Sequence, residues 1–374
     1  AVRTLAEGPD REDLFGLARF LLRSEAIASS RIEGIAPGAK HVALAELAEQ
    51  EQISGFSAQA ELVARNMTLV QDASSNLAST NLVTLDSLIA LHSALLADEP
   101  RHHGLRQVQN WIGGSNHHPL DADFVPPSPE QVPELMDDLV CYLNGATHAP
   151  LLQAALVHAQ FETIHPFTDG NGRMGRALIH TVLARRGLTP TAVLPISLVL
   201  ATFRDDYIRG LTAYRHDAAP HSSTANQSLT TWLQEFATAT IRATQQADEL
   251  REDIRELRQD WQRRVEELRA RQGRQRTMRS DSATGLILAD LPSTPVLTAT
   301  TVQRIHKVSA VAAGRALTEL HEAGIMEPRS AGRGVRAYIA DEVLDLITAT
   351  ERRLASTKFD TRVSAPNRDV PVHP

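Results

Sequence analysis

The run HPFTDGNGRMGR at 165–176 constrains the fold of this chain more than any other segment. Apolar residues recur at helical spacing on both sides of it, so the run must join two helices. Pro166 disfavours a helical conformation at His165 and therefore ends the first helix there. Gly170 and Gly172 permit positive φ angles, so the loop can turn sharply and point N–H groups inward. The sequence predicts a tight interhelical loop with an anion site at the start of the second helix.

The side chains of this run favour phosphate chemistry. Asp169 offers a hard oxygen ligand for Mg²⁺ beside the expected anion site. Arg173 and Arg176 share one face of the second helix and can hold phosphate oxygens with their guanidinium groups. His165 titrates near neutral pH and is the candidate base for a hydroxyl nucleophile. Together they predict phosphoryl or nucleotidyl transfer; the alternative is a structural loop with a structural histidine and surface arginines.

The same run resembles the signature of the Fic family, HPFx(D/E)GNGRxxR, at every fixed position. The resemblance implies an α-helical Fic core that transfers AMP from ATP to a hydroxyl side chain of a protein. It also implies that His165 deprotonates the target Tyr, Thr or Ser. Asp169 would hold Mg²⁺ between the α- and β-phosphates of ATP.

Further roles follow from the same resemblance. Asn171 and the backbone of Gly170 and Gly172 would cradle the α- and β-phosphates, with Arg173 at the β/γ end. Pyrophosphate would be the leaving group. The branch of the superfamily that transfers phosphate has lysine at the position of Gly172, so a kinase activity is disfavoured here.

Residues 29–34, SSRIEG, resemble a second Fic-family motif, the inhibitory sequence (S/T)xxxE(G/N). The motif ends a helical stretch that Gly34 is expected to stop. The resemblance implies that Glu33 pairs with Arg176, the guanidinium expected to clamp the γ-phosphate, so that ATP cannot bind productively. The candidate inhibitory residues are Ser29, Glu33 and Gly34. The alternative is a chance match, because a Ser and a Glu before a helix-ending Gly are common.

Residues 107–127 break the helical pattern, because β-formers alternate there with Gly, Asn and Pro. We expect a short hairpin followed by a proline-stiffened loop, and the hairpin resembles the flap that precedes the catalytic helix in Fic proteins. An exposed strand there would pair with an extended segment of the target and align its hydroxyl with His165. The candidate docking residues are Trp111, Ile112 and Gly113. The side chains of Trp111 and Ile112 fit equally well as core anchors of a hairpin.

Helical periodicity dominates the rest of the chain and predicts a mainly α fold. Arg, Gln and Glu surround an apolar stripe over 242–279, which predicts a long amphipathic helix. Beyond it, short helices and two strands with a Gly-rich tip resemble a small winged-helix (α+β) domain. We expect an N-terminal helical region (1–95) with the inhibitory helix at about 12–34, a Fic core (96–240), a long helix and linker (241–284), a winged helix (285–350) and a disordered tail (351–374).

Composition limits the classes of protein that this chain can belong to. The net charge of −7 gives no global field for nucleic acid or an anionic membrane. The chain has no run of about 18 apolar residues and its first residues do not resemble a leader, so we expect a cytoplasmic protein without membrane association. Cys141, the single cysteine, lies in an apolar stretch, which predicts a buried and inert thiol. The histidine pairs at 102–103 and 117–118 lack a metal-ligand spacing, and we expect them to face solvent.

The sequence thus predicts a protein adenylyltransferase that uses ATP and Mg²⁺, acts on a protein hydroxyl and is autoinhibited by Glu33. A homodimer and self-AMPylation are further expectations. One alternative is a de-AMPylating hydrolase in which Glu33 positions a water. Another is a nucleotide-sensing transcriptional regulator whose winged helix binds DNA. The basic residues for DNA are few (Lys307, Arg315, Arg329, Arg333 and Arg336) and Glu319 and Glu322 lie beside them, so a protein contact is favoured over DNA.

Overall fold

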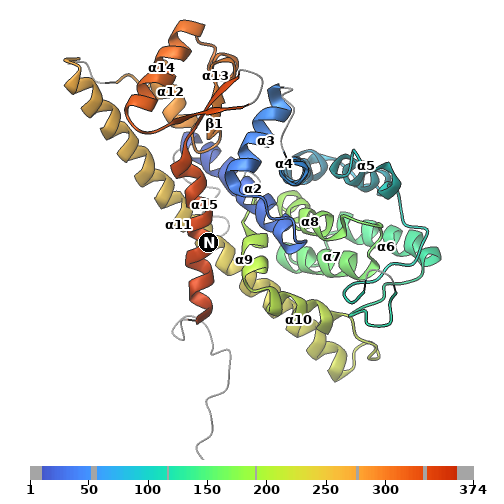
Figure 1. Ribbon diagram of the computed structural model, residues 1–374. Coiled ribbons are helices and arrows are strands. Elements are labelled where there is room, and N and C mark those ends of the chain that lie inside the picture. Colours follow the sequence, from blue (N-terminus) through green and yellow to red (C-terminus); the bar gives the residue numbers. More distant parts are fainter. Residues whose placement is uncertain are drawn as a thin grey trace, which may run out of the picture.

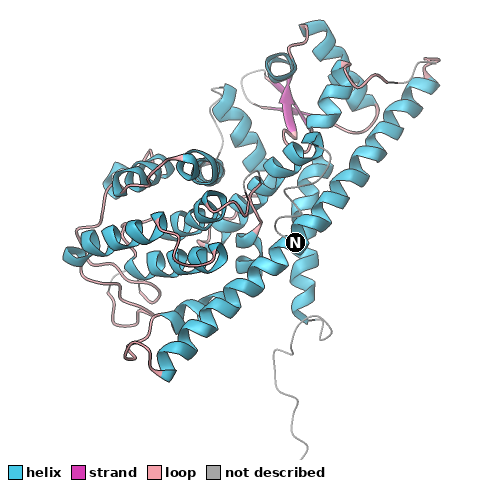
Figure 2. Cartoon of the chain, turned by 180° about the vertical axis from the view of Figure 1, so that it is seen from behind, coloured by secondary structure: helices cyan, strands magenta, loops and turns pink. Residues whose placement is uncertain are grey.

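The computed structural model describes residues 11–51, 57–115, 118–189, 192–274, 278–331 and 335–359. Figure 1 shows a helical body, one long helix that runs diagonally beside it, and a small unit at the far end of that helix. Helices dominate the chain and the strands form one small sheet (Figure 2). The predicted mainly α fold class is confirmed.

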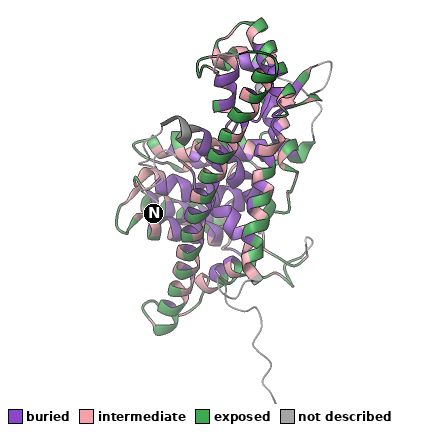
Figure 3. Ribbon diagram, turned by 90° about the vertical axis from the view of Figure 1, so that its left-hand side faces the viewer, coloured by how far each residue is buried: buried purple, intermediate pink, exposed green. Residues whose placement is uncertain are grey.

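The helical body positions the interhelical loop. Its central helix is α8 (Asn171–Arg185), and every residue of α8 from 171 to 183 is buried. Figure 3 shows that buried residues gather in the interior of the helical body. Around α8 pack α2, α4, α7 and a π-helical turn that continues α4. The helices of the body are α2 (Arg11–Ile32), α3 (Ala39–Glu51), α4 (Ala58–Asp72) with the π turn Ala73–Leu77, α5 (Leu85–Leu95), α6 (Val132–Asn144), α7 (Pro150–Ile164), α8, α9 (Ile196–Thr202) and α10 (Arg204–Tyr214).

The long helix differs from its expected bounds. Helix α11 (Ser223–Arg271) has 49 residues and begins where the Ser222 side chain accepts a hydrogen bond from the Ala225 N–H. The boundary that we expected at 240/241 therefore falls inside a single helix. Trp232 and Phe236 pack into the body, whereas Trp261 and Val265 are buried nearer the C-terminal end.

The C-terminal unit contains the predicted helices and hairpin, with one addition. It comprises α12 (Ala283–Asp290), β1 (Val296–Thr298), α13 (Ala299–His306), α14 (Ala310–Glu322), β2 (Glu327–Ser330) and β3 (Arg336–Ile339). We expected residues 297–298 to begin a helix, but Val296 pairs with Ile339, which makes a three-stranded antiparallel sheet of order β1-β3-β2. Long-range pairing overrides the local helical pattern there.

The expectation of a disordered tail from 351 onward is wrong for its first residues. Helix α15 (Asp341–Ser356) continues through them and ends in a 3-10 turn at Thr357–Phe359. Its buried Val343, Ile347, Thr350 and Leu354 recur at helical spacing and turn the helix toward α3, α9 and α11. The last part of the predicted tail, 360–374, lies outside the described residues.

Helices α2 and α3 join the body to the C-terminal unit. Ala43 and Leu47 of α3 share an apolar cluster with Val296 and Ile339 of the sheet. Two polar contacts reach α2 from the same side: the Arg23 guanidinium donates to the Ser293 carbonyl at 3.0 Å, and Arg31 pairs with Glu351 of α15 at 2.7 Å. The position of α2 is thus fixed by both parts of the molecule.

The structure shows the exposure of Cys141 and the lengths of the apolar helices. Cys141 is exposed, so the predicted buried thiol is wrong; it lies on the solvent side of α6, whose Leu139 and Leu143 face the core. Among the helices of the described ranges, none is both long and apolar enough to cross a membrane.

Candidate active site

Residues 165–170 form the tight interhelical loop that Pro166 and the glycines of the run predict, and residues 171–176 begin helix α8. Helix α7 ends at Ile164, and His165 adopts a left-handed conformation with φ 50°. Gly170 has φ 79° and stands directly before the first residue of α8. A left-handed conformation is unfavourable for histidine, so surrounding contacts must hold it.

Arg106 supplies most of those contacts. Its Nε donates to the His165 carbonyl at 2.9 Å, and its guanidinium also reaches the carbonyls of Ile164, Val108 and Pro127. The Arg106 backbone N–H donates to the Pro166 carbonyl at 2.9 Å. One buried side chain therefore ties the loop to both ends of the segment 107–127.

Asn171 closes the loop from the other side. Its Oδ1 accepts a hydrogen bond from the Phe167 N–H at 2.9 Å and its Nδ2 donates to the Phe167 carbonyl at 2.8 Å. Because both ends of the amide are used in this way, the structure gives Asn171 a role in shaping the loop. Its contact with a phosphate stays a prediction.

His92, which the sequence analysis did not single out, supports the same loop. Its ring stacks on Phe167 with centroids 3.7 Å apart, and its Nε2 lies 2.8 Å from the Asp169 carbonyl. Burial lowers the pKa of His92 to about 4. The ring is therefore neutral at pH 7, and Nε2 must carry the proton because a carbonyl only accepts.

His165 presents a neutral imidazole next to this loop. Burial and, to a lesser extent, the nearby Arg215 guanidinium lower its pKa to about 4, against the opposing charge of Glu33. Its side chain is one-fifth exposed, so the ring is partly open to the site. A neutral ring is the form that can accept a proton from a hydroxyl.

Arg173 has the features of an anion-binding residue. Its Nε and Nη1 are buried without a hydrogen-bond partner, and its Nη2 lies 3.6 Å from Asp169 Oδ2. A buried guanidinium with unpaired nitrogens at the first turn of α8 is suited to an incoming anion.

The Asp169 side chain is half-exposed. A metal ion that enters together with a nucleotide could therefore reach its carboxylate. Within the described ranges, no group of three or more His, Cys, Asp and Glu side chains is arranged for a metal ion. One carboxylate fits Mg²⁺, which commonly binds through one or two carboxylates together with substrate phosphates. Asp169 would therefore hold Mg²⁺ jointly with phosphate oxygens.

The inhibitory motif meets the loop at Arg176. Arg176 pairs with Glu33 Oε1 at 2.8 Å, and it also donates to the Ser29 hydroxyl at 3.0 Å and the Ser29 carbonyl at 2.7 Å. A Cβ at Gly172 would lie 2.0 Å from Glu33 Oε1. The carboxylate of Glu33 thus rests against the first turn of α8, where the helix dipole favours negative charge. Gly34 follows with φ 78° and leaves the helical path, as expected.

Buried polar groups hold α2 in this position. Glu25 of α2 accepts hydrogen bonds from the Ser197 N–H at 2.7 Å and lies 2.9 Å from His180 Nε2 on α8. The Asn66 amide of α4 donates to the Ala26 carbonyl and to the Ser30 hydroxyl. These contacts fix the register of α2 against α8 and so place Glu33 opposite Arg176.

The predicted hairpin at 107–127 is reduced to one β-bridge in the described part of that segment, between Ile112 and Phe124. Gly113 and Gly114 turn the chain directly after Ile112, and a Cβ at Gly113 would lie 2.0 Å from Asp123 Oδ2. The Trp111 indole donates to the Ser115 carbonyl at 2.7 Å and so braces the turn. The docking role of Trp111, Ile112 and Gly113 stays a prediction.

Two of the loop histidines have structural partners. His102 Nδ1 lies 2.7 Å from the Thr168 hydroxyl, and His103 Nε2 lies 2.9 Å from the Leu96 carbonyl. His103 is exposed, as expected, whereas His102 is only partly exposed. His117 lies outside the described residues, and His118 is exposed.

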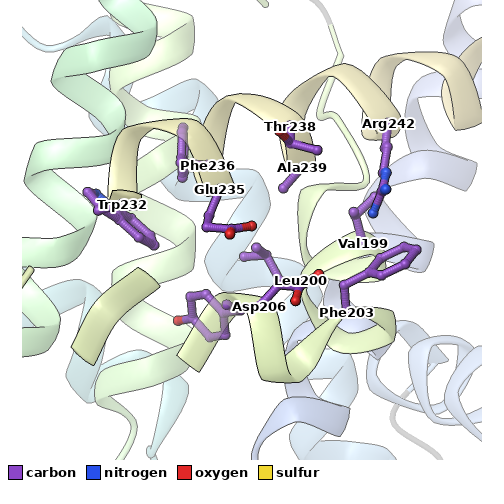
Figure 4. Close-up of a pocket in the computed structure, with 11 residues that line it drawn as sticks. Val199, Leu200, Phe203, Asp206, Trp232, Glu235, Phe236, Thr238, Ala239 and Arg242 are labelled. Atoms are coloured by element: carbon purple, nitrogen blue, oxygen red, sulfur yellow. The ribbon is translucent and has the colours of Figure 1, made fainter. Parts of the chain in front are cut away.

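A pocket between α9, α10 and α11 shows how α10 is fixed (Figure 4). Phe203 lies under the Arg242 guanidinium, whose central carbon is 4.1 Å from the ring centroid. Trp232 of α11 lines the same pocket and donates to the Ala155 carbonyl of α7 at 3.0 Å.

Helix α10 leads into Arg215, which donates to the Glu162 carbonyl at 3.0 Å. Neither Arg215 nor Glu162 could be recognised from a sequence motif, because their contact depends on how helices that are distant in sequence pack together.

The sequence matches the family model described as "Fic/DOC family" over residues 82–183. These residues are similar to a Fic domain. Protein adenylyltransferase fic-1 of Caenorhabditis elegans is 34% identical over 119 residues, which cover 30% of this chain and 22% of that protein. Protein adenylyltransferase Fic of Nematostella vectensis is 32% identical over 158 residues, which cover 40% of this chain and 31% of that protein. The similarity thus spans less than a third of the length of these curated relatives.

Two solved structures resemble the fold. A Fic-domain-containing signalling protein from Bacteroides thetaiotaomicron has a TM-score of 0.54 at 21% identity, covering 67% of this chain and 94% of that chain. A fragment of Fic-1 from C. elegans has a TM-score of 0.51 at 20% identity, covering 67% of this chain and 69% of that chain. The expected Fic-type helical core is confirmed as a fold, while the residue roles rest on the geometry above.

Proposed function

We propose that this chain is a protein adenylyltransferase whose Fic domain transfers AMP from ATP to a protein hydroxyl. The observation that carries the proposal is Arg173, whose buried guanidinium has unpaired nitrogens at the start of α8. The neutral imidazole of His165 supplies a base at the same loop. The curated relatives, which are named protein adenylyltransferases, support adenylyl transfer over other phosphate chemistry.

The transfer follows from these groups. With the phosphates against the first turn of α8, Arg173 would neutralise their charge. His165 takes the proton of the target hydroxyl, the hydroxyl oxygen bonds to the α-phosphorus, and the bond from that phosphorus to the β-bridging oxygen breaks. Pyrophosphate leaves. Mg²⁺ held by Asp169 and the phosphates would supply further charge neutralisation.

Autoinhibition by Glu33 is part of the proposal. The Glu33 carboxylate and a nucleotide phosphate both need the first turn of α8 and the Arg176 guanidinium, so both cannot be present in these positions. The chain is therefore weakly active until the end of α2 shifts.

The first experiment measures label transfer from α-labelled ATP with Mg²⁺ to the chain itself and to lysate proteins. The variants are wild type, Glu33→Gly and Glu33→Gly with His165→Ala, with Glu252→Gly on the exposed face of α11 as the matched control. We expect strong labelling only in Glu33→Gly and its loss with His165→Ala. Ser29→Ala, which removes one of the Arg176 contacts, should activate less than Glu33→Gly.

Two other outcomes of this experiment would contradict adenylyl transfer. If Glu33→Gly does not transfer label while wild type removes AMP from a modified protein, the de-AMPylating hydrolase is the better assignment. If Glu33→Gly binds ATP and does neither, adenylyl transfer is contradicted.

The C-terminal unit keeps its winged-helix interpretation as a proposal, in which it contacts a protein partner. Glu319 turns toward α11, where it pairs with Arg269 at 2.8 Å and with Arg274, so it does not oppose the exposed Arg315. Arg333 lies outside the described residues. Titration with duplex DNA at low salt, together with light scattering, tests DNA binding and the proposed homodimer.

A further inference from the structure

Two buried polar groups, the Glu162 carboxylate and the ring of the proposed base His165, lie near each other, and one atom of each lacks a hydrogen-bond partner. Glu162 lies on the last turn of α7, and its side chain is 7% exposed. Its Oε1 is buried without a partner, and the Nδ1 of His165 is buried without one as well. Glu162 Oε2 lies 3.9 Å from that Nδ1. A buried carboxylate is costly without a donor, so each group is the natural partner of the other.

Helix α8 packs closely over this carboxylate. A Cβ at Gly175 would lie 2.5 Å from Glu162 Oε1, so only glycine leaves room for the carboxylate there. On the other side, Arg215 donates to the Glu162 carbonyl, and its guanidinium lies 4.2 Å from the ring centroid of Phe124. The Glu162 side chain is thus confined beside His165.

We propose that Glu162 is a positioning residue for His165: its carboxylate accepts the Nδ1 proton of the imidazole, leaves Nε2 as the base, and stabilises the imidazolium that forms when the target hydroxyl is deprotonated. This inference rests on the proposed adenylyl transfer. The buried Nδ1 cannot reach a target, which leaves Nε2 for the reaction. The 3.9 Å separation shortens to a hydrogen bond when the site is filled, as such contacts commonly do.

The charges around His165 explain why a carboxylate is needed. Arg215, which follows α10, and Arg106 both disfavour the protonated ring, whereas Glu33 from α2 and the backbone of Glu162 favour it. Arg176 of α8 acts on Glu162. When Glu33 moves away from the site, Glu162 is the remaining carboxylate among these charged groups. Burial raises the pKa of Glu162 to about 7, against the opposing charge of Arg176, and Glu33 contributes to the increase. Removing Glu33 therefore lowers that pKa, and the carboxylate is ionised more fully in the active state.

The test uses the active Glu33→Gly background with Glu162→Gln, which keeps the shape and removes the charge. We expect kcat to fall about 10- to 100-fold, within the range of general-base effects, with the KM for ATP changed less than threefold. The rise of kcat with pH near the pKa of Glu162 should disappear. Glu162→Asp should restore part of the rate. Glu319→Gln, which removes a buried carboxylate far from His165, is the matched control and should keep both kcat and the pH profile.

A second measurement does not depend on turnover. Nitrogen NMR of the His165 ring, with His165→Ala for assignment, should show the Nδ1–H form in the Glu33→Gly protein and a mixture of tautomers in Glu162→Gln. An unchanged pH profile or an unchanged tautomer in a folded Glu162→Gln protein overturns the proposal. If the Glu33→Gly protein itself transfers no AMP, the proposed function fails, and the NMR result still decides the role of Glu162.

Discussion

The loop at 165–170 and the segment 107–127 lie side by side but differ in how firmly other residues hold them. Carbonyls of the loop accept hydrogen bonds from Arg106, Asn110 and Asn171, and His92 stacks beneath it. The neighbouring segment has one β-bridge in its described part and leaves three apolar side chains in solvent: Val108 (60% exposed), Leu120 (86%) and Val125 (48%). The groups proposed to act on a nucleotide are pre-positioned, whereas the surface proposed for a protein target is left uncovered.

Arg106→Ala should have the largest effect on the loop, because Arg106 makes most of the contacts that hold it. Several buried carbonyls lose their donor, so we expect a loss of about 3–5 kcal/mol in the free energy of unfolding. Transfer in the Glu33→Gly background should fall more than about 100-fold, because the His165 backbone is no longer held. Chemical unfolding and label transfer measure the two effects.

Arg185→Ala is the matched control. Arg185 also donates to carbonyls, at Thr80 and neighbouring residues, but it lies at the far end of α8. It should lose stability and keep most of its transfer activity per folded molecule. Equal losses of activity in the two variants would contradict the special role of Arg106.

Acid should weaken the loop through His92. The pKa of this ring is about 4 in the folded chain and 6.5 in the unfolded one, so the unfolded state binds the extra proton between these values. Stability contributed by the neutral ring is intact above pH 6.5 and is lost as the pH falls toward 4, by up to about 3 kcal/mol. Unfolding curves from pH 8 to 4.5 measure this loss.

His92→Phe keeps a ring on Phe167 and removes the titration. It should be less stable than wild type at pH 8, because the bond to the Asp169 carbonyl is lost, and show a shallower decline with acid. A decline as steep as that of wild type would assign the acid sensitivity to other groups, among them His158, whose pKa burial lowers to about 3.

The smallest effect on the fold is expected from the exposed segment. Leu120→Ser, alone or with Val108→Ser, should change the free energy of unfolding by less than about 0.5 kcal/mol, because these side chains are already in solvent. The KM for a protein target should rise several-fold while the KM for ATP stays constant. Parallel changes in both constants would show that this segment also shapes the nucleotide site.

The sequence was most informative where structure is local. Pro166 and Gly170 determine the loop through the backbone angles that they permit, so the end of α7 and the start of α8 were predictable. The pairing of Glu33 with Arg176 was expected only because two motifs resembled one family. Arg106 and His92 were missed because their partners lie 59 and 77 residues away, and a lone Arg or His carries no sign of such a partner. The same limitation explains β1, whose partner strand is distant, and the helices α9 and α10, which were not predicted.

Gly172 has a consequence for how inhibition can be lost through mutation. Its missing side chain is the space that the Glu33 carboxylate fills, since a Cβ there would lie 2.0 Å from Oε1. If Glu33 inhibits as proposed, a methyl group at 172 would displace its carboxylate and would also crowd the turn of α8 where the phosphates are proposed to lie. A genetic screen for hyperactive chains should thus yield changes at 33, whereas changes at 172 and 176 also alter the proposed phosphate site.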